Sequence, residues 1–178
     1  MSVLKNLILS LLIVISQIAY SQTDAPRATF NITYSTGQTL GMNFLAGKDW
    51  VFGFDGSVYM GQAAVGRDYT NVIGPNAFKN DIYEIVDAPS VSASLLLGKK
   101  VSDRLSLFSK IGFGSQRRYY NGYDPSQILS PNGYWYTSQP LSTQVLIGAG
   151  AQYTINKLAL QLHYDKFNQV TFGLGIGF

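Results

Sequence analysis

The sequence predicts an all-β fold, an eight-stranded antiparallel up-and-down transmembrane β-barrel. Apolar residues recur at every second position in about eight separate runs, as expected when side chains alternate between the two faces of a strand. The links between runs are alternately tight and longer. The composition combines 18 glycines, 12 tyrosines and 10 phenylalanines with only 13% charged residues, which favours strands over helices.

The last twelve residues show the pattern most clearly. One face of this segment is large and apolar, and consists of Val170, Phe172, Leu174, Ile176 and Phe178. Thr171 and three glycines, Gly173, Gly175 and Gly177, occupy the positions between. Glycine weakens a strand unless something approaches closely or the sheet bends. A narrow membrane barrel requires this combination, with bulky residues toward lipid and small residues toward a crowded lumen.

The N-terminal segment, residues 1–21, has the features of a secretory signal peptide. Lys5 precedes a mostly apolar stretch at residues 7–19, and Ala19-Tyr20-Ser21 fits a small-x-small cleavage site. The stretch is too short for the roughly 20 apolar residues of a membrane helix. We therefore predict export and a single mature domain at residues 22–178.

The composition also excludes several classes of protein. Without cysteine, the chain can have no disulfide framework, lipoprotein anchor or thiolate metal site. The net charge of +3 comes from scattered basic residues, which do not form the stripe that nucleic-acid binding requires. We expect no cofactor, no metal ion and no nucleic-acid partner.

Taken in chain order, the runs lie at residues 30–34, 40–46, 50–60, 91–97, 105–114, 141–153, 158–165 and 170–178. The links at 47–49, 98–103 and 154–157 are tight, whereas those at 35–38, 62–89, 116–139 and 166–168 form a second set with two long members. This is the arrangement of an outer-membrane barrel, with short turns on one side and longer loops outside. Residues 82–86 are expected to extend the fourth strand beyond the membrane, with Pro89 at an edge or break. Ten strands remain an alternative, if 62–89 contains a hairpin.

Aromatic residues are placed near both ends of these runs. Trp50 and Tyr153 lie beside the tight turns, and Tyr34, Tyr136, Tyr164 and Phe167 lie near the opposite end. Aromatic girdles of this kind mark the two membrane interfaces.

The closing strand, the signal peptide and the eight runs together resemble the small OmpX/OmpA-transmembrane-type barrels of Gram-negative bacteria, in the style found in Bacteroidetes. The resemblance implies location in the outer membrane, among lipids that include lipopolysaccharide. It also implies that the barrel assembly machinery recognises the last strand through Val170, Phe172, Leu174, Ile176 and Phe178. We expect a monomer that is not a general porin, because the side chains of an eight-stranded barrel fill its interior.

Polar residues on the second face of the runs are the first candidates for function. They are Asn43, Asp55, Ser57, Lys110, Gln144, Gln161, His163 and Asp165. Asp55 and Lys110 lie near the middle of their strands and are expected to pair, because a charge in a dry interior needs a partner. The network either stiffens the barrel or relays protons or ions.

His163 and Asp165 allow an alternative reading as an enzyme. They share a strand face, and a carboxylate can orient a histidine for base catalysis. A lipid-modifying enzyme of the outer membrane is therefore one alternative, although no nucleophile motif accompanies the pair. A secreted soluble barrel of the lipocalin kind is another. Against it, the non-apolar faces carry glycine and neutral polar residues rather than the many charges of a soluble surface.

The two long links are the expected working surface of a non-enzymatic barrel. Residues 116–139 contain Arg117, Arg118, Tyr119, Tyr120, Tyr123, Tyr134, Trp135 and Tyr136. Tyrosine, tryptophan and arginine dominate binding hot spots. This cluster either binds an extracellular ligand, packs onto the barrel rim, or faces anionic lipopolysaccharide.

Overall fold

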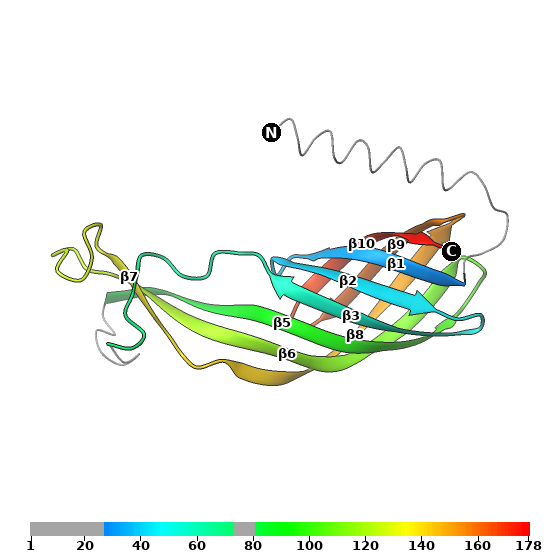
Figure 1. Cartoon of the computed structure of the whole chain (residues 1–178), viewed down its shortest axis with the longest axis horizontal. Coiled ribbons are helices and arrows are strands. Elements are labelled where there is room, and N and C mark those ends of the chain that lie inside the picture. The colour runs from blue at the N-terminus through cyan, green and yellow to red at the C-terminus, as the bar shows by residue number, and fades with distance from the viewer. Residues whose placement is uncertain (1–26, 73–80) are drawn as a thin grey trace, which may run out of the picture.

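The computed structural model describes residues 27–72 and 81–178, which form a closed barrel with a sheet extending from one end (Figure 1). The predicted signal peptide lies outside the described residues. Eight strands form the barrel wall: β1 (Ala28–Ser35), β2 (Thr39–Ala46), β3 (Trp50–Tyr59), β5 (Ile82–Lys100), β6 (Leu105–Tyr123), β8 (Ser142–Ile155), β9 (Leu158–Asp165) and β10 (Gln169–Gly177).

Each barrel strand pairs antiparallel with its neighbours, and β1 pairs with β10 to close the wall. The predicted eight-stranded antiparallel barrel is confirmed. The ten-stranded alternative is wrong, because the two further strands, β4 (Arg67–Asp68) and β7 (Tyr134–Ser138), lie outside the barrel wall. Strand β7 pairs with the far end of β6, and β4 pairs with β7.

The two faces of the wall are chemically opposite. In β1, the side chains of Thr29, Asn31 and Thr33 are buried in the lumen, while Ile32 and Tyr34 are more than half exposed. The same alternation gives an apolar exterior around the barrel, formed by residues that include Met42, Phe52, Phe54, Leu95, Ile111, Phe113, Val145, Ile147, Leu162 and Phe172. A soluble barrel has the inverse arrangement. The closed backbone and this exterior define a transmembrane β-barrel.

Tight turns at 47–49, 101–104 and 156–157 define one end of the barrel, the short-turn end, and the other end is the long-loop end. Exposed aromatic side chains lie at both ends, with Trp50 and Tyr153 at the short-turn end and Tyr34 and Tyr164 at the long-loop end. Two predicted girdle residues are placed differently. Tyr136 lies beyond the barrel on β7, and Phe167 turns toward the barrel axis instead of toward lipid.

The predicted long loops, 62–89 and 116–139, are partly strand, which corrects the sequence-based boundaries. Strands β5 and β6 continue past the barrel and pair from Pro89↔Gln116 to Ile82↔Gly122. We call the part of the sheet that projects from the barrel in Figure 1 the extended sheet. It consists of residues 82–89 and 116–123 together with β7 and β4. Pro89 lies at a register shift, beyond the last β3 pair, Val58↔Val91. A proline has no N–H for a second neighbouring strand, so it suits the point where β5 leaves β3.

Among residues 27–72 and 81–178, no helix is both long and apolar enough to cross a membrane.

Replacing Leu95 with arginine is expected to destabilise the barrel by about 2–4 kcal/mol, the cost of a cation at the lipid-facing midplane. Leu95 is 68% exposed and lies midway along the barrel part of β5. Urea unfolding in lipid vesicles measures the change. Ile85→Arg is the matched control, because Ile85 is 58% exposed on the same strand but lies in the extended sheet. Equal destabilisation by both substitutions would contradict a lipid-facing belt.

Candidate functional site

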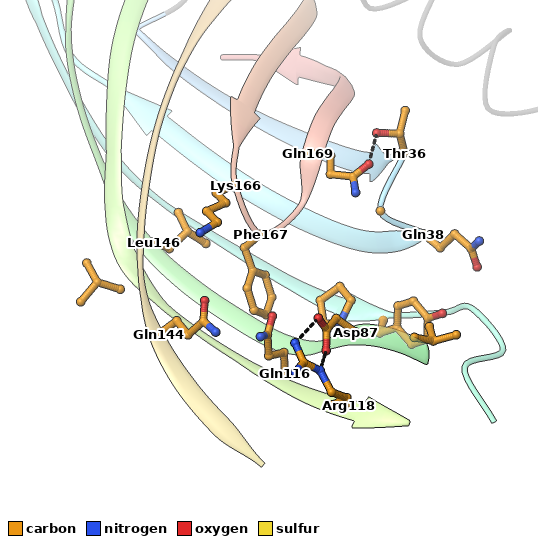
Figure 2. Close-up of a pocket in the computed structure, with 15 residues that line it drawn as sticks. Thr36, Gln38, Asp87, Gln116, Arg118, Gln144, Leu146, Lys166, Phe167 and Gln169 are labelled. Atoms are coloured by element: carbon orange, nitrogen blue, oxygen red, sulfur yellow. Dashed lines mark hydrogen bonds and ion pairs between the residues drawn. The ribbon is translucent and has the colours of Figure 1, made fainter. Parts of the chain in front are cut away.

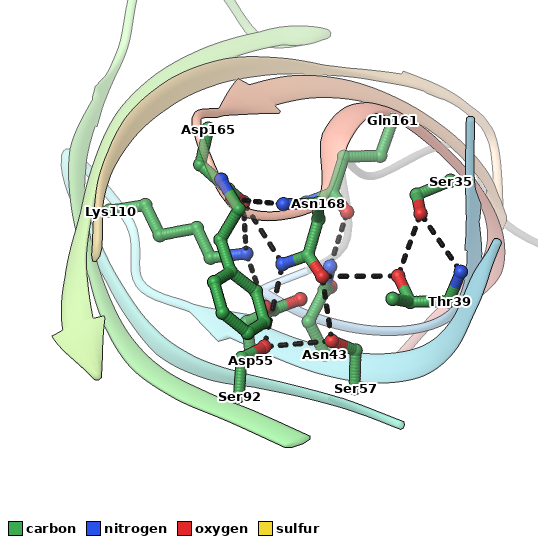
Figure 3. A network of polar contacts seen from close by, with 11 residues as sticks. Ser35, Thr39, Asn43, Asp55, Ser57, Ser92, Lys110, Gln161, Asp165 and Asn168 are labelled. Atoms are coloured by element: carbon green, nitrogen blue, oxygen red, sulfur yellow. Dashed lines mark hydrogen bonds and ion pairs between the residues drawn. The ribbon is translucent and has the colours of Figure 1, made fainter. Parts of the chain in front are cut away.

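Three charged side chains from three separated strands meet in the lumen. Lys110 on β6 places its Nζ 2.6 Å from Oδ2 of Asp55 on β3 and 2.9 Å from Oδ2 of Asp165 on β9 (Figure 3). All three side chains are at most 1% exposed. The predicted pairing of Asp55 with Lys110 is present, and Asp165 makes it a triad. Burying each ion costs several kcal/mol, so the triad is stable only if its remaining polar atoms are satisfied.

The β9–β10 turn supplies most of the hydrogen-bond donors that the buried Asp165 carboxylate needs. This carboxylate accepts hydrogen bonds from Lys110 Nζ, from the backbone N–H groups of Phe167 (2.9 Å) and Asn168 (2.6 Å), and from Nδ2 of Asn168 (3.1 Å). Because three of these donors belong to residues two and three positions further along the chain, the carboxylate fixes the conformation of the turn. Phe167 and Asn168 therefore turn inward over the triad.

Asn168 connects this inward turn to the opposite wall of the barrel. Its Oδ1 accepts hydrogen bonds from Thr39 Oγ1 on β2 (3.1 Å) and Ser57 Oγ on β3 (3.0 Å), and its Nδ2 donates to Ser92 Oγ on β5 (3.4 Å). Asn168 is 2% exposed. One asparagine thus links β2, β3 and β5 to the β9–β10 turn across the lumen, as Figure 3 shows.

A layer of amide side chains lies nearer the short-turn end. Asn31 Nδ2 donates to Asn43 Oδ1 (2.9 Å) and to Gln152 Oε1 (3.0 Å), and Asn43 Nδ2 donates to Gln161 Oε1. These residues come from β1, β2, β8 and β9. Below them, Leu45, Val51, Leu96 and Phe108 form the buried apolar cluster. The lumen is thus packed in successive layers. This packing favours a rigid interior over a path for solutes.

His163 is packed inside the same lumen. It is 2% exposed, and its ring lies edge-on to Phe108 with the ring centroids 6.1 Å apart. Neither ring nitrogen has a hydrogen-bond partner among the described residues. Asp165 points to Lys110 and the turn, so the structure shows no His163–Asp165 hydrogen bond of the kind that orients a catalytic base.

Seven of the eight lumen candidates are buried together: Asn43, Asp55, Ser57, Lys110, Gln161, His163 and Asp165. Gln144 is on the predicted face of β8, but it lies at the mouth of the barrel and is exposed. Sequence reasoning did not select Asn31, Ser92, Gln152, Thr39 and Asn168. Strand phase identifies the first four. Asn168 has no such signal, because it lies in a turn.

The second candidate region, the extended sheet, is a folded structure rather than a loose loop. Trp135 on β7 is fully buried, and a Cβ on Gly122 of β6 would lie 2.8 Å from its Nε1. Asn121 is 1% exposed; its amide donates to Ala63 O (3.1 Å), and its Oδ1 accepts from Val65 N (3.2 Å). The chain between β3 and β4 is thereby tied to β6.

The tip of the extended sheet is also held by hydrogen bonds. Asp124 accepts from the backbone N–H groups of Ser126 (2.9 Å), Ile128 (2.8 Å) and Leu129 (3.0 Å). The Ser126 hydroxyl and these N–H groups hold the pKa of Asp124 below its usual range. The acid is therefore ionised where it fixes the loop.

The predicted binding residues divide by position. Trp135 is buried, and Tyr119, Tyr120 and Tyr136 are half-buried. The exposed members are Arg117, Arg118, Tyr123 and Tyr134. Tyr134 lies between Tyr123 and Tyr83, with ring centroids 4.9 and 6.1 Å away. Trp135 is therefore an internal packing residue, and tyrosine and arginine make the accessible surface.

Arg118 is engaged by a carboxylate of the neighbouring strand. Its Nε and one terminal nitrogen donate to the two oxygens of Asp87 at 2.6 and 2.7 Å. This fork lowers the pKa of Asp87 and raises the pKa of Arg118 above its ordinary value. Both side chains are more than 40% exposed, so the pair contributes little to stability. Its effect is to neutralise Arg118 locally.

Within residues 27–72 and 81–178, no group of three or more histidine, aspartate or glutamate side chains is arranged to hold a metal ion.

Comparison with known proteins gives similarities in structure. No protein-family model matches the chain, and no curated protein matches it. Among solved structures, the chain is similar to Ail, the attachment invasion locus protein of Yersinia pestis, solved in complex with the heparin analogue sucrose octasulfate. Sequence identity is 15%, the TM-score is 0.43, and the match covers 84% of this chain and 92% of Ail. It is also similar to a de novo designed transmembrane β-barrel, with 15% identity, a TM-score of 0.39, and coverage of 88% and 97%. The apolar exterior and the closed wall of this chain define it as a transmembrane barrel independently of these similarities.

Replacing Lys110 with methionine is expected to destabilise the barrel by about 3–5 kcal/mol, because it leaves two buried carboxylates without their cation. Urea unfolding of the refolded protein measures the loss. The triple variant Lys110→Met/Asp55→Asn/Asp165→Asn is the control. It removes all three charges, so it should recover part of the stability lost in the single variant. A single variant as stable as the parent would contradict a structural role for the triad.

Proposed function

We propose that this chain is a non-enzymatic integral protein of the outer membrane, in which a closed barrel holds the extended sheet outside the cell as a binding surface. The observation that carries the proposal is the continuity of β5 and β6, which run from the barrel wall into the extended sheet as single strands of 19 residues. The anchor and the projecting surface are therefore one unit. Buried Trp135 and Asn121 give that surface a fixed shape, which a specific binding surface needs.

The orientation follows from the two kinds of connection. Outer-membrane barrels place short turns in the periplasm and long loops outside. On this basis the short-turn end faces the periplasm and the extended sheet faces the exterior. The surrounding partners are then outer-membrane lipids, including lipopolysaccharide. We further propose recognition of Val170, Phe172, Leu174, Ile176 and Phe178 by the barrel assembly machinery, and a monomeric state.

The binding surface is formed by the exposed residues of the extended sheet, Arg117, Tyr123 and Tyr134. Tyrosine and arginine supply large contact areas and hydrogen bonds at hot spots. Arg118 is already paired with Asp87, which weakens the case that two adjacent arginines attract a polyanion such as lipopolysaccharide. An extracellular ligand that contacts tyrosine rings fits the surface better.

The alternative of a lipid-modifying enzyme has less support. His163 and Asp165 are at most 2% exposed and lie inside the lumen, whereas the lipid substrate lies outside the wall. The carboxylate of Asp165 already accepts four hydrogen bonds. A structural role accounts for both residues.

A closed lumen predicts the absence of porin-scale conductance. Purified protein inserted in a planar bilayer should give no stable open channel, because the triad, the amide layer and the apolar cluster fill the interior. A porin measured under the same conditions is the positive control. Regular openings of porin size would overturn the closed-barrel proposal.

The proposed orientation can be tested by labelling, because the native sequence has no cysteine. Ile128→Cys, at a position 84% exposed near the tip of the extended sheet, should react with a membrane-impermeant maleimide on intact cells. Lys48→Cys, in a tight turn at the short-turn end, should react only after the outer membrane is permeabilised. The reverse labelling pattern, or recovery of the protein in the soluble periplasm, would contradict the proposal.

A further inference from the structure

A cavity of about 540 Å³ lies at the mouth of the barrel, at the long-loop end (Figure 2). Its walls come from the β1–β2 link, from β3, β5, β6, β8 and the start of β10, and from the β9–β10 turn. Phe167 and Leu146 reach into it, and the Asp165–Asn168 network lies at the base of the same turn. A Cβ on Gly114 would lie 2.8 Å from the Phe167 ring, so glycine is needed for the ring to adopt this position.

The volume falls in the range of small-molecule sites, roughly 300–1,000 Å³. The lining identifies the ligand chemistry. Four glutamines line the cavity: Gln38, Gln116, Gln144 and Gln169. Each carboxamide offers two N–H donors and a carbonyl acceptor.

These amides are largely uncommitted within the described chain. The side chains of Gln38, Gln116 and Gln144 make no hydrogen bond to another described residue. Gln169 uses only its Oε1, which accepts from Thr36 Oγ1 at 3.3 Å. The glutamines come from different strands and links, so the barrel wall itself brings them around one space.

The charges of the lining favour a neutral ligand. Asp87 and Arg118 satisfy each other through two hydrogen bonds, which leaves the exposed Lys166 as the unpaired charge among the lining residues. One lysine is a weak site for a polyanion. A purely apolar ligand is also disfavoured, because it would leave the amides without partners.

We propose that this cavity binds a neutral saccharide. Neighbouring hydroxyls of a sugar are both donors and acceptors, and they match carboxamide groups. The apolar C–H face of the sugar ring packs against the flat ring of Phe167. The site is separate from the exposed tyrosines of the extended sheet, and it does not depend on the proposed function or on the orientation in the membrane.

The test uses the full mature chain refolded in lauryldimethylamine oxide, a detergent without a sugar headgroup. The probes are maltose, lactose and N,N′-diacetylchitobiose, and their binding is measured by saturation-transfer NMR and calorimetry. Sodium sulfate is tested separately as an anionic ligand. We expect at least one disaccharide to bind with a Kd on the order of 1 mM. Gln116→Ala/Gln144→Ala should weaken that binding by about tenfold, because each lost amide removes hydrogen bonds.

Gln62→Ala is the matched control, because Gln62 is an exposed glutamine at the same end but does not line the cavity. It should bind the disaccharide as the parent does. Heat-modifiable migration shows that each variant is folded. Three outcomes would overturn the proposal: no transfer to any of the three disaccharides, unchanged binding by the folded double variant, or binding of sulfate alone.

Discussion

The burial of Lys110 between Asp55 and Asp165 is the interaction on which the rest of the barrel interior depends. Side chains fill the interior of an eight-stranded wall, so the lumen ions depend on protein groups: Lys110 on two carboxylates, and Asp165 on Lys110 and the β9–β10 turn. Asp165 obtains its donors by drawing the β9–β10 turn inward. In this inward conformation, Asn168 hydrogen-bonds to Thr39, Ser57 and Ser92, and Phe167 lines the mouth cavity. The electrostatic requirement of one lysine thus shapes both the packed lumen and the cavity above it.

Strand positions and faces could be predicted because alternation reports directly which side chains face lipid. Phe54, Leu95 and Ile111 differ so strongly in polarity from Asp55, Ser94 and Lys110 that the register of each strand is fixed by burial alone. The same rule led from Asp55 and Lys110 to their ion pair. It placed Gln144 on the correct face but not at the correct depth, since period-two alternation carries no information on height along the barrel axis.

The extended sheet could not be delimited in this way. Beyond the membrane both faces of β5 and β6 contact water or protein, so Tyr119, Asn121 and Tyr123 show no contrast with their neighbours. Asn121 and Gly122 are also residue types common in turns. Their strand conformation is set by tertiary partners, Trp135 on Gly122 and Ala63 on Asn121. The inward turn at Phe167 was missed for a related reason, because its direction depends on a carboxylate that is itself held by a distant lysine.

The pairing of β1 with β10 has a consequence for the kinetics of folding. The first and last barrel strands are adjacent in space, and the three lumen charges lie on β3, β6 and β9. These contacts join residues far apart in the chain, and contacts of this kind make folding slow. Until the wall closes, the polar face of the sheet is open to water, and the ions need no protein partner. Formation of the triad therefore belongs to a late step, coupled to closure, and the barrier to reopening includes separating these charges.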